Sequence, residues 1–292
     1  MAKRNGVVED RAVSVLRRRR WGENYPPAMS DSLDDFTETT FDHDGTSQRV
    51  FRQGEGPAVI VMAEIPGITP KVADFARRVV AAGFTVVMPV LFGTPGAEVS
   101  PLNGLKVITG ACVSKEFAAF ATNRTAPVTA WLRALAADAH ETCGGPGVGA
   151  VGMCFTGGFA LGMMVDERML APVLSQPSLP IGPLGKSKRA LQLAPDDLAK
   201  VKERAADGVC VLGLRFTGDI LSPGDRFARL REELGDAFIG VEIDSSKGNE
   251  WGIPKMAHSV LTEHLVDEPG HPTRVALDQV LDFFKDKLLT AP

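Results

Sequence analysis

The sequence predicts an α/β fold: a mostly parallel, doubly wound sheet with helices on both faces. Short apolar runs typical of strands alternate with segments whose apolar residues recur at helical spacing. Runs such as Ala58–Ala63 are apolar throughout, as expected of strands buried on both faces of a parallel sheet. Crossovers between parallel strands are right-handed, so the loops after the strands gather at one edge. We therefore look for functional residues in those loops.

The first elements predict an N-terminal antiparallel hairpin, followed by strand and helix. Phe36–Phe41 and Gln48–Arg52 flank the dipeptide Asp44-Gly45, a strong turn signal. After the buried strand, Thr69-Pro70 offers an N-cap and a first-turn proline, and apolar residues recur at helical spacing until Gly83.

The same alternation continues to the end of the chain. Later strands are predicted at Phe84–Met88, Val148–Gly152, Leu170–Leu174, Val209–Leu214 and Phe238–Ile243. Later helices are predicted around Val128–Ala136, from near Phe155, at Pro195–Ala206, at Gly224–Leu234 and around Leu277–Leu288. No internal repeat or linker interrupts this pattern, so residues 36–292 are predicted to form one domain.

Composition and charge exclude several classes of function. The 292 residues are 44% hydrophobic with a formal net charge of −4, which gives no global basic field for nucleic acid. The uncharged run Thr142–Val165 contains eight glycines and is interpreted as strand, turn and helix rather than as a membrane span. Four cysteines without a C-x-x-C pair indicate neither a metal site nor a disulfide framework, and we expect a cytoplasmic protein with reduced thiols.

The N-terminal segment differs from the rest of the chain. Residues 1–28 carry seven Lys or Arg and three acidic residues, so the remainder has a net charge of −8. We predict that residues 1–35 form a basic, disordered extension; the alternative is an arm that binds phosphate or a membrane surface. Met29 is an alternative start, and we expect the native protein to begin there.

The strongest chemical signal is a small-residue strand that runs into Cys154. Gly152 stands two residues before this cysteine, and Gly157 and Gly158 stand three and four residues after it. This is the pattern of a nucleophile elbow with cysteine in place of serine, in which small residues let strand and helix backbones approach closely. The start of a helix also favours the thiolate. A buried structural cysteine, or a phosphate-binding turn, is the alternative.

Two later residues fit the order nucleophile, acid, histidine of an α/β-hydrolase site. Asp219 follows the strand predicted at Val209–Leu214, and His258 follows the strand predicted at Phe238–Ile243. Both therefore fall in loops at the expected edge of the sheet. Local competitors for the two roles are Asp225, Asp244, His264 and His271.

Four motifs in this order resemble the dienelactone hydrolase family of α/β-hydrolases. They are Ala63–Gly67, Gly152–Gly158, Gly218–Pro223 and Ala257–Ser259, and the resemblance spans about residues 36–289. It implies an α/β-hydrolase fold and a carboxylic ester hydrolase that needs no metal or organic cofactor. The expected partner is a small ester or lactone substrate, and the oligomeric state stays open.

The resemblance also implies roles for individual residues. Cys154 matches the nucleophile, His258 the general base and then acid, and Asp219 the carboxylate that orients the imidazole. The chemistry agrees, because a thiol that attacks an ester needs a base, and a carboxylate on the far ring nitrogen fixes the useful tautomer. The intermediate would be an acyl-thioester. A non-catalytic binding protein with the same fold is the alternative.

Three further residues are implied beside the nucleophile. Glu64 matches a strand-end glutamate that interacts with the resting thiol and couples thiolate formation to substrate binding. Its apolar neighbours predict a buried carboxylate, which needs partners. The backbone N–H groups of Ile65 and Phe155 are expected to form the oxyanion hole.

Some positions depart from the family pattern. Thr262 stands four residues after His258, where members that open dienelactone have an arginine for the substrate carboxylate. Lys115 and Arg124 are candidate replacement cations, although ordinary surface or capping roles are the alternative. Gln176–Pro183 is interpreted as a surface excursion and a candidate lid. The sequence therefore supports a lactone or ester hydrolase more firmly than it supports dienelactone as the particular substrate.

Overall fold

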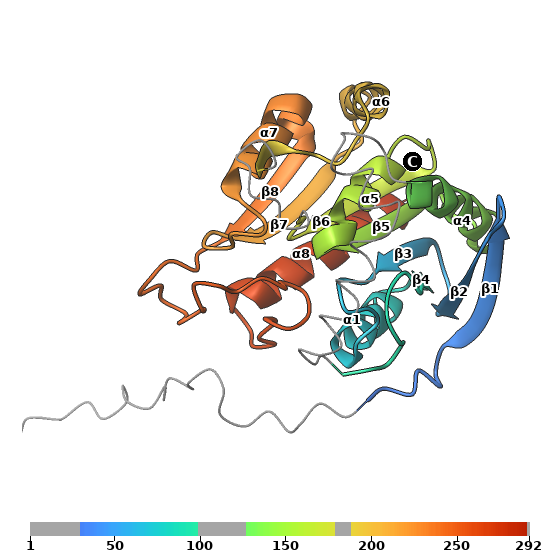
Figure 1. Cartoon of the computed structure of the whole chain (residues 1–292), viewed down its shortest axis with the longest axis horizontal. Coiled ribbons are helices and arrows are strands. Elements are labelled where there is room, and N and C mark those ends of the chain that lie inside the picture. The colour runs from blue at the N-terminus through green and yellow to red at the C-terminus, as the bar shows by residue number, and fades with distance from the viewer. Residues whose placement is uncertain (1–29, 99–126, 179–187, 291–292) are drawn as a thin grey trace, which may run out of the picture.

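One sheet of eight strands organises the protein, as Figure 1 shows. The structure, a computed structural model, describes residues 30–98, 127–178 and 188–290. The strand order is β1-β2-β4-β3-β5-β6-β7-β8, antiparallel from β1 to β4 and parallel from there on. The strands are β1 (Thr37–His43), β2 (Thr46–Gln53), β3 (Ala58–Met62), β4 (Thr85–Pro89), β5 (Val148–Met153), β6 (Met169–Ser175), β7 (Val211–Phe216) and β8 (Phe238–Ile243). The mostly parallel sheet and the N-terminal hairpin are thus confirmed.

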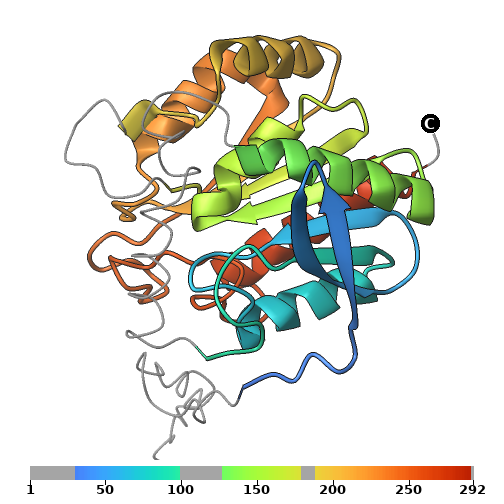
Figure 2. The same ribbon diagram turned by 45° about the vertical axis from the view of Figure 1, so that its right-hand side comes forward.

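Helices cover both faces of this sheet. They are α1 (Pro70–Ala81), α4 (Pro127–Cys143), α5 (Gly157–Met163), α6 (Pro195–Ala206), α7 (Gly224–Leu234) and α8 (Pro272–Leu288), with short 3-10 turns at Cys154–Thr156 and Gly235–Ala237. In Figure 2, α1 lies on one side of the sheet and α4 on the other. Among the described residues, no helix has the length and apolarity to cross a membrane.

The N-terminal hairpin forms because its turn residues accept left-handed backbone. Asp44 has φ 47° and Gly45 has φ 74°, which suits a two-residue turn whose twist matches that of the strands. The register runs from Thr37 opposite Arg52 to His43 opposite Thr46. The hairpin therefore extends the sheet beyond β4, with its turn at the predicted dipeptide.

The strand before Asp219 begins two residues later than the predicted Val209. The N–H of Val209 donates to the carbonyl of Arg204 at 3.1 Å, so Val209 still belongs to the turn that closes α6. Strand β7 also ends two residues later than predicted, at Phe216, and only Thr217 and Gly218 separate its end from Asp219.

Residues 31–35, predicted within the basic extension, pack against the domain. Leu33 is buried, and Asp31 and Asp35 each form an ion pair with Arg77 of α1, at 2.7 Å in both cases. The part of the predicted extension before residue 30 lies outside the described residues.

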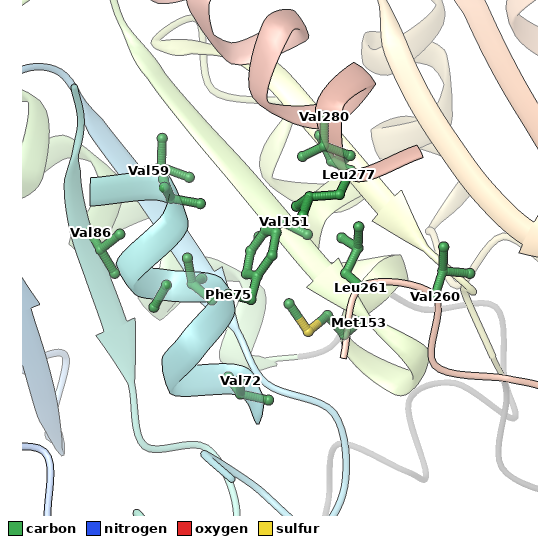
Figure 3. Packing of buried hydrophobic residues seen from close by; sticks show 14 of the residues in the cluster. Val59, Val72, Phe75, Val86, Val151, Met153, Val260, Leu261, Leu277 and Val280 are labelled. Atoms are coloured by element: carbon green, nitrogen blue, oxygen red, sulfur yellow. The ribbon is translucent and has the colours of Figure 1, made fainter. Parts of the chain in front are cut away.

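Two apolar cores lie on opposite faces of the sheet. One joins α1 and α8 to the sheet, and Figure 3 shows Phe75 and Leu277 of these helices close to Val151 of β5. The other joins α4, α5, α6 and α7 to the opposite face. Phe284 of α8 is fully buried in the first core and packs edge-on against Phe84, with ring centroids 6.0 Å apart.

Phe284→Ala should destabilise the domain strongly, because it leaves a cavity between α8 and β5. We expect a loss of about 3–5 kcal/mol in the free energy of unfolding, measured by urea denaturation. Leu289→Ala is the control, since this side chain is 46% exposed and its removal should change stability by no more than about 0.5 kcal/mol. Equal effects of the two substitutions would contradict the described packing.

Candidate active site

The ends of β3 and β5 bring two predicted site residues to the same edge of the sheet. These strands are parallel, and Met62 pairs with Gly152. Glu64 and Cys154 each stand two residues beyond this pair. Parallel strands keep such positions at one edge, so the two side chains start from neighbouring points of the backbone.

Cys154 occupies a sharp turn between β5 and α5. Its φ is 55°, a left-handed conformation that is strained for a residue other than glycine. Thr156 fixes the turn: its hydroxyl accepts from the Met153 N–H at 2.8 Å and lies 2.9 Å from the carbonyl oxygen of Met62. The predicted elbow therefore has the backbone of a nucleophile turn, and it is tied to the neighbouring strand.

The glycines around Cys154 are required by close backbone contacts. A Cβ on Gly152 would lie 2.1 Å from the carbonyl oxygen of Thr156. A Cβ on Gly157 would lie 2.8 Å from Pro177, and one on Gly158 would overlap the side chain of Gln192. The predicted close approach of strand and helix backbones is thus confirmed for Gly152, whereas Gly157 and Gly158 make room for Pro177 and for the side chain of Gln192.

Gly152→Ala should damage the elbow, because the obstructing atom is a backbone oxygen that cannot move aside cheaply. Overpacking of this kind costs about 1–3 kcal/mol, and we expect a loss of that size in thermal or urea denaturation. Gly224→Ala is the matched control, since its Cβ would meet nothing closer than Arg215 at 3.5 Å. A Gly152→Ala protein as stable as that control would contradict the contact.

Asp219 and His258 form a buried pair at the same edge. The Asp219 Oδ2 atom lies 2.7 Å from His258 Nδ1, and its Oδ1 atom accepts from the Leu221 N–H at 2.9 Å. The Asp219 side chain is only 3% exposed. With both oxygens engaged, this carboxylate has one orientation and holds the imidazole in one orientation too.

The local competitors make other contacts. Asp244 is exposed and accepts from the Ser246 N–H within its own turn, whereas Asp225 lies in the first turn of α7. His271 caps α8, and its Nδ1 lies 2.7 Å from the Thr273 hydroxyl. Geometry thus pairs Asp219 with His258, as the chain order predicts.

Cys154 lies beside the other face of this pair. Burial by itself would lower the pKa of His258, but the Asp219 hydrogen bond and the interactions with Cys154 and Asp219 outweigh it and raise the pKa. The Nε2 atom of His258 is buried, and within the described residues it has no hydrogen-bond partner. The imidazole is therefore held on its Asp219 side, and its remaining nitrogen is left for the thiol or a substrate.

Asp219→Asn should lower the pKa of His258, because the carboxylate then no longer opposes the effect of burial. Two-dimensional NMR titration of the imidazole measures this directly. A raised pKa adds stability that is fully present below about pH 6.5 and is lost as the pH rises through the raised value. The stability advantage of wild type over Asp219→Asn should therefore be largest near pH 6 and shrink toward alkaline pH. A constant difference would contradict the described pair.

Glu64 is buried, as its apolar neighbours predict, and its carboxylate has three polar partners. The Oε2 atom accepts from Ser259 Oγ at 2.7 Å and from Gln176 Nε2 at 3.3 Å. The Oε1 atom accepts from the hydroxyl of Thr262. Thr262, at the position of the family's arginine, is thus a buried partner of Glu64 and is only 2% exposed.

The remaining predicted residues divide between the site and the undescribed segments. Ile65 directly follows Glu64, and Phe155 directly follows Cys154, so the backbones of both lie at the same sheet edge. Lys115 and Arg124 lie outside the described residues. The prediction of a surface excursion at 176–183 is wrong for residues 176–178, which are buried, and the rest of this candidate lid lies outside the described residues.

Three further residues support the site in ways that the sequence does not predict. Gln176 follows β6 with φ 37°, and its Oε1 accepts from the Val260 N–H at 3.2 Å. His264 Nδ1 lies 3.4 Å and 3.3 Å from the backbone nitrogens of His258 and Ser259. The position of Gln176 directly after a buried strand could have indicated it, whereas nothing local distinguishes His264.

Arg226 of α7 is the third such residue, and it joins two loops beneath the site. Its guanidinium donates to the carbonyls of Pro177, Ala190 and Leu221. Burial lowers the pKa of Arg226 to about 10, against the attraction of Asp219 and Cys154. This cation therefore lies close to the acid and the thiol while it fixes their loops.

Metal ligation finds no support in the part of the chain that the structure describes. No group of three His, Cys, Asp or Glu side chains there could hold a metal ion.

A cysteine at a strand-to-helix turn, with an acid and a histidine from later loops at the same sheet edge, defines an α/β-hydrolase. The model of the dienelactone hydrolase family matches residues 46–192, just over half of the 292 residues. The chain therefore belongs to the dienelactone hydrolase family and is an ester hydrolase by class. No curated protein matches the sequence.

Solved structures of low sequence identity share the fold. A protein from Klebsiella pneumoniae subsp. pneumoniae MGH 78578, described as a dienelactone hydrolase, is 19% identical with a TM-score of 0.58, covering 85% of this chain and 97% of that one. Dienelactone hydrolase from Anabaena variabilis ATCC 29413 is 16% identical with a TM-score of 0.54, covering 87% and 99%. A dienelactone hydrolase-like promiscuous phosphotriesterase from metagenomic libraries is 15% identical with a TM-score of 0.53, covering 87% and 98%.

Proposed function

We propose that this protein hydrolyses a small ester or lactone with Cys154 as nucleophile, His258 as general base and acid, and Asp219 as the residue that orients the imidazole. The observation that carries the proposal is the 2.7 Å contact between Asp219 and His258, beside a cysteine in a left-handed turn. The raised pKa of His258 adds support, since it favours an imidazolium next to a thiolate.

In the first step, the sulfur of Cys154 bonds to the ester carbonyl carbon while its proton resides on His258. The carbonyl oxygen becomes negative, and the N–H groups of Ile65 and Phe155 are the donors proposed to stabilise it. When the tetrahedral intermediate collapses, the bond to the alkoxy oxygen breaks and His258 gives that oxygen its proton. The product of this step is an acyl-thioester on Cys154; for a lactone, the alcohol stays attached to the acyl group.

In the second step, water replaces the alcohol. His258 accepts a proton from the water, whose oxygen bonds to the thioester carbonyl carbon. Collapse of this second intermediate breaks the bond to sulfur, releases the carboxylic acid and returns the proton to the thiol pair. Asp219 keeps the imidazole in one tautomer throughout and stabilises its charged form.

One position of the loop that carries His258 bears on the substrate class. Where dienelactone-opening members have an arginine, Thr262 is buried and donates to Glu64. This position therefore offers a substrate no positive charge. We infer that a substrate carboxylate is not required, and that neutral short esters and lactones are suitable substrates.

Cys154→Ala should abolish turnover of activated short esters and of dienelactone, because no other group replaces the sulfur. We expect a loss on the order of 10⁴-fold in kcat after subtraction of the background. Cys143→Ala is the matched control: its thiol is also partly buried, but it lies at the end of α4. Turnover retained in Cys154→Ala would place the chemistry elsewhere.

Labelling separates an enzyme from a protein that only binds small molecules. Iodoacetamide at neutral pH should modify Cys154 faster than Cys112, Cys143 or Cys210, which mass spectrometry of digested protein resolves. Equal labelling of the four thiols, together with no turnover on the ester panel, would favour the binding protein.

A further inference from the structure

The loop that carries His258 lies between β8 and α8 and contains neither helix nor strand around residues 256–264. Some of its backbone donors bond carbonyls within the loop, such as the N–H groups of Ala257 and His264, and others must find partners elsewhere. The N–H groups of His258 and Ser259 point to His264 Nδ1, and that of Val260 donates to Gln176 Oε1. Three successive residues, beginning with the histidine itself, are thus held by side-chain acceptors.

Side chains of the same loop also point to Glu64. Ser259 and Thr262, 195 and 198 residues away in the sequence, donate to different oxygens of this carboxylate. Gln176 joins the two sets of contacts, since its Nε2 donates to Glu64 while its Oε1 accepts from Val260. Glu64, Gln176, Ser259 and Thr262 form one buried group, here named the Glu64 cluster; their exposed fractions are 6%, 0%, 6% and 2%.

We propose that Glu64 is a positioning residue that sets the place of His258 by holding its loop through Ser259, Thr262 and Gln176. The inference rests on the proposed function, because it takes His258 as the group that moves protons. It differs from a direct action of Glu64 on the thiol, since both carboxylate oxygens are already engaged with the loop or with Gln176.

Apolar side chains also hold this loop, but they do not set its orientation. Val260 and Leu261 are 0% and 1% exposed and, as Figure 3 shows, lie in the same core as Met153, the residue before Cys154. Apolar burial alone would keep the loop attached, but it is non-directional. Hydrogen bonds to a fixed carboxylate define direction as well as distance. The Glu64 cluster therefore adds orientation to a loop that the core already retains.

A carboxylate at this place has a cost that an apolar residue would avoid. Burying a charged group is unfavourable unless its hydrogen bonds are satisfied, and a partly satisfied cluster is worse than none. Glu64 satisfies this condition with donors from the catalytic loop itself. Removing either the carboxylate or the hydroxyls that donate to it should therefore displace the loop that carries His258 and lower turnover.

The test compares Glu64→Gln, the double variant Ser259→Ala/Thr262→Val, and the combination of all three. Each is assayed for kcat and KM on an activated ester across pH. Misplacement of a reacting group by about 1 Å can cost about 10²-fold, so we expect kcat to fall tenfold to a hundredfold in the first two variants, with KM little changed. In the combined variant, kcat should fall by no more than the larger of the two separate decreases, because all the substitutions remove the same contacts.

Two further readouts separate positioning from a general loss of structure. The alkaline limb of the pH profile should move to lower pH in both variants, because a loosened loop weakens the Asp219–His258 bond that raises the pKa of the imidazole. Amide hydrogen exchange at Val260 should become faster. Thr129→Val is the control, a buried hydroxyl lost from α4 on the opposite face, and it should alter neither the pH profile nor exchange in this loop.

The outcomes distinguish the inference from the proposed function. If Ser259→Ala/Thr262→Val keeps the wild-type rate and pH profile while Glu64→Gln is slow, Glu64 acts on another group and the inference fails. It also fails if Glu64→Gln changes neither kcat nor exchange at Val260. Retained turnover in Cys154→Ala would overturn the proposed function instead, and exchange at Val260, measured without substrate, would still decide whether Glu64 holds the loop.

Discussion

The pairing of Met62 with Gly152 in the parallel β3–β5 ladder fixes where the site can form. Ladder hydrogen bonds keep the two strand ends in register, so whatever follows them emerges side by side at one edge. A slip by one residue would exchange the faces of every side chain on the strand, which buried strands do not tolerate. The turn at Cys154 adds a second fixed point, because Thr156 reaches back to Met62. The nucleophile is consequently placed by the strand ladder and by the hydroxyl of Thr156.

The acid and the histidine lack that support, and buried polar side chains take its place. Asp219 is reached through a short turn after β7, whereas His258 stands in a long irregular segment. Backbone groups in such a segment must find partners when they are buried. His264 and the Glu64 cluster provide them, so the precision of a site on loops comes from contacts between residues far apart in the chain.

The sequence predicts the parts of this arrangement that local chemistry determines. The elbow can be predicted because glycines are sterically required at fixed spacings around Cys154. Asp219 and His258 can be predicted because the order nucleophile, acid, histidine along the chain leaves few candidate residues. Strand β7 was displaced by two residues because the turn after α6 is closed by a hydrogen bond that no composition signals. Gln176 and His264 were not assigned because their partners lie 84 residues and five or six residues away and are selected only by tertiary contacts.

The buried guanidinium of Arg226 has a consequence for how the site could respond to its surroundings. It bonds the carbonyls of Pro177 and Leu221, and Leu221 in turn donates to Asp219. The residue after Pro177 donates its N–H to the carbonyl of Cys154 at 2.9 Å. The backbone beside the thiol and the turn of the acid are thus mechanically linked through a single side chain. A displacement of the segment after β6 would therefore also reach the turn of Asp219, through Arg226 and Leu221.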